Sequence, residues 1–207
     1  MKKTILFAAA ALLLAASCCH KNATTTADAV MANILSRKSV RSYTADSVPA
    51  AVIDNLLRAA MAAPSGMDIR PWSFVVLTDK SQYDSVFEGN FNMRMFKESA
   101  AVIVLCADTT VTRPPRDNPE GAAVTMPNPI WRDDMGAATE NLLLAAEAHG
   151  LGACWTACYP FADRMDPIRR ALQLPANVVP YSVVPVGVPA GDNQPKDKWD
   201  PSRIRRL

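Results

Sequence analysis

Apolar side chains recur three and four residues apart in several parts of this chain, which is the spacing of a helix that buries one face. Residues 27–36 show this pattern behind polar residues suited to cap a helix. A second pattern starts after Pro49 and ends at Pro64, and the longest one runs over residues 131–149. Weaker helical patterns cover residues 80–87, 92–97 and 163–173, where Pro167 interrupts the last one early.

Continuous apolar runs predict buried strands between these helices. They cover residues 73–78, 101–106, 151–158 and 178–188. Pro180 and Pro185 break the last run. Helices and strands alternate, but a proline-bearing strand fits an α+β layer better than a regular doubly wound sheet.

Two stretches follow neither periodicity. Residues 63–72 are irregular and join the second helix to the first strand. Residues 109–129 are proline-rich, and a structureless loop of that length in a compact domain is often functional. We therefore expect a lid there, or a disordered segment. Trp131 follows this loop and is the tryptophan that we expect to contact a substrate, whereas Trp72 and Trp155 fit the core.

The composition fits one compact domain over residues 27–207. The chain has 207 residues, of which 49% are hydrophobic and 20% charged, and it shows no internal repeat. Its formal net charge of +2 provides no broad basic surface, so we expect no nucleic-acid partner. Only 8 glycines are present and none belongs to a G-x-G-x-x-G motif, which argues against a Rossmann dinucleotide site.

The first residues have the parts of an export signal. Two lysines precede an apolar run over residues 5–16, which is too short to span a bilayer, and small residues end it. We expect residues 1–17 to be a signal peptide of the bacterial lipoprotein type, with Cys18 lipid-bearing and residues 18–26 a flexible tether. The protein would be exported to the cell envelope, facing the periplasm or the outside, and touch the membrane only through this anchor. A plain signal peptide cut near Ser17 is the alternative.

Three cysteines remain in the body of the chain, Cys106, Cys154 and Cys158. An odd number does not suggest a disulfide framework, although spacing cannot tell whether two of them pair. Cys154 and Cys158 lack the second ligand pair of a zinc site, and the only histidines are His20 and His149. We expect no metal site, and buried cysteines instead.

A basic stretch, Arg37-Lys38-Ser39-Val40-Arg41, ends the first predicted helix. Arginine offers a planar fork of donors to phosphate oxygens, lysine adds a point charge, and a serine hydroxyl bonds an oxygen without adding charge. The stretch is therefore suited to hold a phosphate. Taken alone, it could equally be a solvated basic surface.

Four separated motifs resemble the FMN-dependent nitroreductase family, in that family's order and spacing. Residues 37–43 read R-K-S-V-R-S-Y, like its R-R-S-x-R-x-F opening, and residues 64–74 read P-S-G-M-D-I-R-P-W-S-F, like P-S-x-x-N-x-Q-P-W-x-F. Residues 134–155 contain D-M-G-A-A-T-E-N-L-L-L-A-A and then G-L-G-A-C-W, and residues 196–198 stand where the family has a late basic pair. The resemblance spans roughly residues 30–198.

This resemblance implies a nitroreductase-like α+β fold, in which helices flank a central mixed, mostly antiparallel sheet, and an intertwined homodimer. It implies FMN as the cofactor and no catalytic side chain, because the cofactor carries the chemistry. The implied cofactor-binding residues are Arg37, Lys38, Ser39, Arg41, Pro64, Ser65, Gly66, Met67, Asp68, Arg70, Thr156, Ala157, Cys158, Lys196 and Lys198.

The implied contacts divide among the parts of FMN. Arg37, Ser39 and the two late lysines hold the phosphate and ribityl end. Arg41 lies near the pyrimidine side of the flavin, where a cation stabilises the reduced ring. Residues 64–70 come from the second subunit, and residues 156–158 present backbone N–H groups to the N5 and O4 edge.

Two residues depart from the family pattern. Asp68 stands where the family usually has Asn, and Arg70 where it has Gln. An amide that both donates and accepts thus becomes a carboxylate that only accepts, and a free carboxylate beside the flavin would oppose its reduction. We expect Asp68 and Arg70 to pair and jointly replace the amide contacts.

The function that the resemblance implies is an FMN-dependent oxidoreductase with a ping-pong mechanism. A small-molecule donor, NAD(P)H or another, reduces the flavin, and a nitroaromatic, quinone or similar acceptor then reoxidises it. Export complicates the choice of donor, because NAD(P)H is not expected to be abundant outside the inner membrane. The alternatives are a non-hydride branch of the family, deiodinase-like or flavin-destroying, and a non-catalytic, lipid-anchored flavin-binding protein.

Overall fold

The computed structural model describes residues 25–207. The predicted signal peptide, the lipid-bearing Cys18 and the tether up to residue 24 lie outside the described residues. The chain divides between Ala32 and Asn33, and the core and site below belong to the unit Asn33–Leu207. Within residues 25–207, no helix has both the length and the apolar character needed to cross a membrane.

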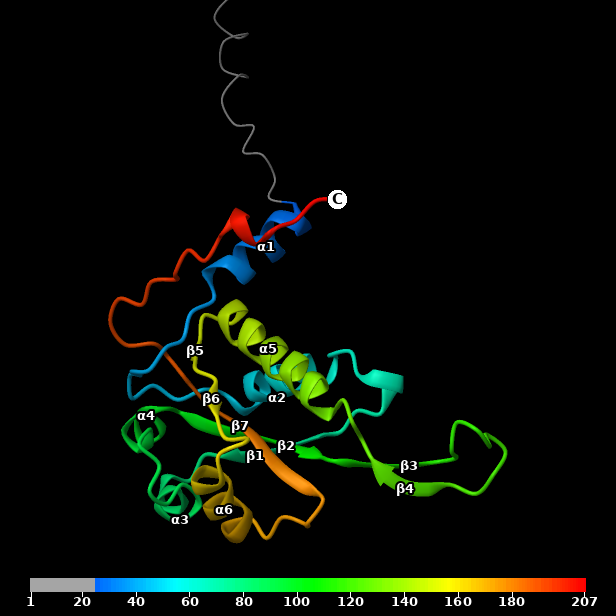
Figure 1. Ribbon diagram of the computed structural model, residues 1–207. Helices are drawn as coiled ribbons and strands as arrows, with labels where there is room; N and C mark the ends of the chain where they lie inside the picture. Colours follow the sequence, from blue (N-terminus) through cyan, green and yellow to red (C-terminus); the bar gives the residue numbers. More distant parts are fainter. Residues whose placement is uncertain (1–24) are drawn as a thin grey trace, which may run out of the picture. The chain divides into compact units, whose positions relative to one another are not determined.

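The predicted helices are all present (Figure 1). They are α1 (Thr26–Ser36), α2 (Ala50–Met61), α3 (Tyr83–Val86), α4 (Met93–Glu98), α5 (Trp131–Ala148) and α6 (Ala162–Ala171), with 3-10 turns at Gly66–Asp68, Lys80–Gln82 and Pro201–Arg203. The strands are β1 (Trp72–Leu77), β2 (Ala101–Asp108), β3 (Thr110–Arg113), β4 (Val124–Pro127), β5 (Gly152–Ala153), β6 (Thr156–Ala157) and β7 (Val178–Gly187). Helix α6 continues through Pro167, so the expected interruption there is wrong.

One antiparallel sheet forms the centre of the unit, in the order β1, β2, β7, β5, with β6 also paired to β7. Val104 of β2, for example, lies opposite Val75 of β1 and Val183 of β7. A single parallel bridge joins Ser39 to Ala153. The sheet is therefore mixed but mostly antiparallel, and the predicted α+β class is confirmed.

Strand β2 separates two hydrophobic cores, because successive side chains of a strand point to opposite faces of the sheet. Ile103 and Leu105 pack in the core that contains residues of α2 and α5. Val102 and Val104 pack in the core that contains residues of α3, α4 and α6. Figure 1 shows these two sets of helices on opposite sides of the sheet. Helix α5 has buried residues along most of its length, from Trp131 to Ala146.

The expected break in the last strand is wrong, because β7 runs through both of its prolines. On the side away from β2, only Ser182, Val183, Val186 and Gly187 pair with β5 and β6. Neither Pro180 nor Pro185 is paired with β5 or β6. The backbone N–H that a proline lacks is therefore not required by either of these strands. The predicted third strand, in turn, is the two short strands β5 and β6 with a gap between them.

The stretch predicted as a lid or a disordered loop, residues 109–129, folds into the hairpin β3–β4. No side chain of β3 or β4 is completely buried. Their sequences also lack the continuous apolar run that predicts a buried strand. Trp131 follows the hairpin but is only 4% exposed and lies edge-on to Tyr159, with ring centres 4.9 Å apart. The expectation that Trp131 contacts a substrate is therefore wrong for this structure.

Candidate cofactor site

The basic stretch 37–41 is attached to the edge of the sheet. The backbone N–H of Val40 donates to the carbonyl of Ala153 in β5, at 3.0 Å. A Cβ on Gly152 would lie 2.6 Å from Cγ1 of Val40, so glycine permits this close approach. Val40 is 1% exposed and belongs to the core. The residues on either side of Val40, Ser39 and Arg41, are exposed.

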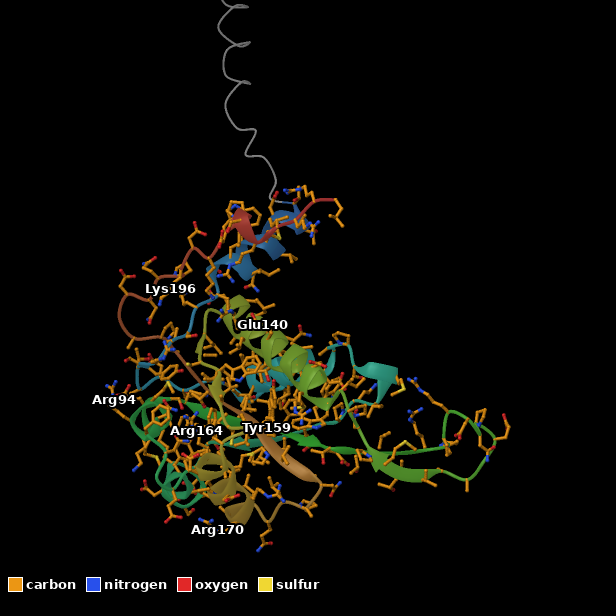
Figure 2. All side chains as sticks on the ribbon, in the orientation of Figure 1. Arg94, Glu140, Tyr159, Arg164, Arg170 and Lys196 are labelled. Atoms are coloured by element: carbon orange, nitrogen blue, oxygen red, sulfur yellow. The ribbon has the colours of Figure 1, made fainter. Side chains whose placement is uncertain are left out.

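The structure brings this basic stretch together with the late lysines. A pocket of about 410 Å³ is lined by Arg37, Lys38, Ser39, Arg41, Asp192, Asn193, Gln194, Lys196 and Lys198. We call it the basic pocket. Figure 2 labels Lys196 on the segment that follows β7. Five cations and one carboxylate line this pocket, which is the charge balance that a phosphate requires.

Two cations of the basic pocket form ion pairs with helix α5. Nε of Arg37 lies 3.1 Å from Oε1 of Glu140, which Figure 2 labels on α5, and Nζ of Lys38 lies 2.9 Å from Oε1 of Glu147. Within residues 25–207, Arg41 forms no such ion pair and donates to the backbone carbonyl of Ser39 at 3.3 Å. The basic pocket therefore contains two cations that ion pairs with α5 hold in place, and other cations that form no ion pair within the described residues.

A second, separate pocket shares one lining residue, Arg41, with the basic pocket. It has a volume of about 220 Å³ and is lined by Arg41, Phe91, Asn92, Cys154, Trp155, Thr156, Ala157 and Arg164. We call it the aromatic pocket. It contains Thr156 and Ala157 of the predicted set, so the structure places these β6 residues beside the basic stretch as expected.

Sequence reasoning missed several residues that line these pockets. Phe91 and Asn92 lie in the link before α4, and Phe91 is 75% exposed, a sign that could be found only in a structure. Trp155, which was expected in the core, is half-buried: it packs against the core that contains α2 and α5, and it also lines the aromatic pocket. Asn193 and Gln194 lie just before the late lysines, so extending that motif by three residues towards the N-terminus would have included them.

The cysteines are buried and free. Cys106, Cys154 and Cys158 are each 3% exposed or less and form no disulfide. Burial raises the pKa of Cys106 and of Cys158 to about 12. Cys158 does not line either pocket, and its backbone N–H donates to Tyr181, so it is not placed to contact a ligand there. Burial also raises the pKa of Cys154, although the nearby charge of Arg41 opposes this.

The segment 64–70 lines neither pocket of its own chain. Met67, Asp68 and Arg70 have φ angles of 55°, 56° and 52°, in the left-handed region that costs energy for any residue with a Cβ. The N–H of Gly66 donates to the buried carboxylate of Asp134 at 2.9 Å, which ties this strained turn to α5.

The expected pairing of Asp68 with Arg70 is present. Nε of Arg70 donates to Oδ1 of Asp68 at 2.6 Å, and Nη2 donates to Oδ2. This hydrogen bonding holds the pKa of the Asp68 carboxyl below its usual value. Both side chains are exposed, so the pair stands on the surface where another molecule can reach it.

The comparisons with known proteins agree on one family. The model of the nitroreductase family matches residues 34–93 and 87–188. A protein of Methanothermobacter thermautotrophicus, named "Putative NADH dehydrogenase/NAD(P)H nitroreductase", is 37% identical over 175 residues, which are 84% of this chain and 85% of that protein.

Solved structures have the same fold. A crystal structure from Bacteroides thetaiotaomicron with that same name is 40% identical, covers 86% of this chain and 96% of its own, and superposes with a TM-score of 0.75. A crystal structure from Desulfovibrio desulfuricans, titled a putative nitroreductase in complex with FMN, is 25% identical over 86% of this chain and 96% of its own, with a TM-score of 0.70. The chain belongs to the nitroreductase family and has its fold.

Proposed function

We propose that this protein is an FMN-dependent oxidoreductase that passes electrons from a reduced donor, NAD(P)H or another, to a nitroaromatic, quinone or similar acceptor. The observation that carries the proposal is that Arg41 lines both the basic pocket and the aromatic pocket. One pocket offers cations and a hydroxyl, and the other offers aromatic side chains and an exposed strand. FMN has a phosphate at one end and an aromatic ring system at the other, so the residues present fit it.

The basic pocket would hold the phosphate and ribityl end. Lys196 and Lys198 form no ion pair within residues 25–207, so their charges are available to phosphate oxygens. Arg37 is paired with Glu140, which fixes its guanidinium and leaves its other donors for a ligand. Ser39 is exposed beside them and supplies a hydroxyl.

The aromatic pocket would hold the flavin ring. When bound, FMN supplies the hydride and electron chemistry that no side chain of this site provides. Arg41 would lie beside the ring, where its unpaired positive charge favours the reduced, more negative form. Ala157 is the exposed residue of β6, so its backbone is the part of that strand that can meet the ring edge.

The segment 64–70 would complete the site of a second copy in a homodimer. Three observations support this assignment: the segment matches a family motif, it lines neither pocket of its own chain, and its strained turn is held by Asp134. The exposed pair of Asp68 and Arg70 would then contact the ring from the partner subunit. We further propose that the protein is exported and anchored in the cell envelope by a lipid on Cys18.

The proposal is tested by steady-state turnover of the purified protein with FMN. We expect NADH or NADPH oxidation that depends on a nitroaromatic or quinone acceptor, with double-reciprocal plots that are parallel when both substrates are varied, and intact FMN recovered at the end.

The alternatives give different results in this assay. Loss of FMN in proportion to turnover would indicate the flavin-destroying branch. Bound FMN that no donor reduces would indicate a carrier without turnover. Either result would reject the proposed reaction.

A further inference from the structure

Arg164 lines the aromatic pocket but belongs to no motif of the sequence. It lies in the first turn of α6, and Figure 2 shows it between α6 and β6. Its Nη1 donates to the carbonyl of Ala157 at 2.9 Å. The guanidinium carbon lies 4.3 Å from the ring centre of Phe161 and 4.9 Å from that of Phe91.

These contacts fix the direction of the guanidinium. Stacking between two aromatic rings is favourable for arginine and restricts its rotation, and the hydrogen bond to Ala157 restricts it further. The donors of a guanidinium lie in its plane, so a group held in this way offers its remaining N–H bonds in a set direction. Such a preorganised donor loses little entropy when a ligand binds.

The positive charge of Arg164 is not compensated nearby. Within residues 25–207 it forms no ion pair, and its Nε is buried without a hydrogen-bond partner. No Asp or Glu lines the aromatic pocket, whereas both Arg41 and Arg164 do. A pocket that has two arginines, no carboxylate, and the aromatic side chains Phe91 and Trp155 suits an aromatic molecule that carries an anionic group.

We propose that Arg164 determines acceptor specificity, by selecting aromatic acceptors that carry a carboxylate. This inference rests on the proposed function, in which Arg41 serves the flavin and leaves Arg164 for the second substrate. The ring of the acceptor would stack on the flavin ring held in the aromatic pocket, and its carboxylate would accept hydrogen bonds from the guanidinium of Arg164 in the pocket wall. A neutral acceptor of the same shape fits the pocket but lacks this contact.

A purely structural role for Arg164 has different consequences. If Arg164 only supports Ala157 and Phe91, its replacement distorts the pocket for charged and neutral ligands alike. The ratio of the affinity or kcat/KM for a carboxylate to that for its matched amide therefore distinguishes a specificity role of Arg164 from a structural role.

The experiment compares benzoate with benzamide as ligands, and 4-nitrobenzoate with 4-nitrobenzamide as acceptors. Calorimetry measures binding of the first pair to the FMN-loaded protein, and kcat/KM is measured for the second pair. The variants are Arg164→Gln and Arg164→Lys. Arg170→Gln is the matched control, because Arg170 lies near the other end of the same helix and pairs only with the exposed Glu88 (Figure 2).

We expect the wild-type protein to favour the carboxylate in both pairs. Arg164→Gln should reduce that preference about tenfold, which corresponds to ~1.4 kcal/mol, and leave the amides within about twofold. Arg164→Lys should retain part of the preference because it keeps the charge, and Arg170→Gln should retain all of it. The preference should also weaken as the salt concentration rises.

Three results would overturn the inference: no benzoate binding to the wild-type protein, an equal loss for carboxylate and amide in Arg164→Gln, or a preference that this variant retains. Failure of the proposed function is recognised separately, as a protein that binds no FMN or reduces neither acceptor. In that case acceptor specificity is rejected together with the proposed function, and benzoate titration of the FMN-free wild type and Arg164→Gln tests separately whether Arg164 binds a carboxylate.

Discussion

At the scale of single residues, the basic stretch contains cations in different electrostatic states. Arg37 and Lys38 are paired with carboxylates of α5, whereas Arg41 is exposed and contacts only a backbone carbonyl. A paired cation still donates hydrogen bonds, but its net charge is largely cancelled. An unpaired cation acts at full charge on a ring beside it. Arg37 is therefore suited to holding FMN and Arg41 to tuning it.

This division predicts opposite effects for two substitutions. Arg37→Gln should weaken FMN binding by about tenfold, the effect of losing one charge-assisted hydrogen bond, and leave the flavin potential nearly unchanged. Arg41→Gln should lower the two-electron midpoint potential by about 30 mV, which corresponds to a tenfold weaker preference for the reduced form, and retain most of the FMN. Equilibrium dialysis and a spectroelectrochemical titration measure the two quantities. Equal effects of both substitutions on both quantities would show that the division is wrong.

The buried thiols predict how stability depends on alkaline pH. Burial raises the pKa of Cys106 and Cys158 to about 12 from an ordinary value of 9.0. A raised folded-state pKa means that the thiols lose protons more readily in the unfolded chain. The contribution of the two protonated thiols to the free energy of unfolding is therefore complete below pH 9 and is lost as the pH rises towards 12.

Urea unfolding between pH 8 and pH 11 measures this effect. The free energy of unfolding should fall above pH 9, by up to about 1.4 kcal/mol per pH unit for each thiol. Cys106→Ala should lower stability at pH 8, because it leaves a cavity, but should make the alkaline fall less steep. An unchanged slope in this variant would show that Cys106 is not responsible.

At the scale of elements, α2, α5 and the core strands could be predicted because their apolar patterns correspond to buried side chains. Helix α1 was predicted from the same apolar spacing, but it buries none of its residues in this chain. The hairpin β3–β4 could not be predicted, because its side chains are exposed or half-buried and show no apolar run. Strand β7 was expected to break because a proline cannot donate a hydrogen bond. Whether Pro180 needs that bond depends on where β6 pairs, which the chain order does not reveal.

The candidate site was predictable where its residues fall in short motifs. The basic stretch and the late lysines meet in one pocket as expected. Phe91 and Arg164 were missed because they come from the link before α4 and from α6, and no local pattern records that these segments meet the β6 residues in one pocket. The burial of Cys158 likewise follows from the register of β6 with β7.

The basic stretch packs so closely on β5 that one methyl group added to Gly152 should lower the stability of the fold. In Gly152→Ala, the new Cβ would meet Val40, which is buried and cannot move freely. We expect a loss of about 1–3 kcal/mol in the free energy of unfolding, together with weaker FMN binding, because the stretch 37–41 is displaced.

Gly136→Ala is the matched control for this substitution. Gly136 lies inside α5, and a Cβ there meets its nearest neighbour, the hydroxyl of Tyr181, at an ordinary 3.6 Å. We expect a gain of about 0.5–1 kcal/mol and unchanged FMN binding, because alanine favours a helix interior over glycine. If Gly152→Ala behaves like this control, the close approach at Val40 does not position the site.

At the scale of the whole molecule, the described unit presents two pockets that share Arg41, and a strained, exposed segment that lines neither. A homodimer in which the segment 64–70 reaches the partner's flavin accounts for both features. It also accounts for the pairing of Asp68 with Arg70, because a carboxylate brought to a flavin on a partner subunit would otherwise oppose its reduction.

We propose that FMN binds across the basic and aromatic pockets, beside Arg41, and accepts electrons there. The most direct measurement is the visible absorption spectrum of the purified protein, reconstituted with FMN and then titrated anaerobically with NADH and NADPH. We expect a bound-flavin spectrum whose visible absorption is bleached by one of the two donors. A protein that stays colourless after incubation with FMN would contradict the proposal.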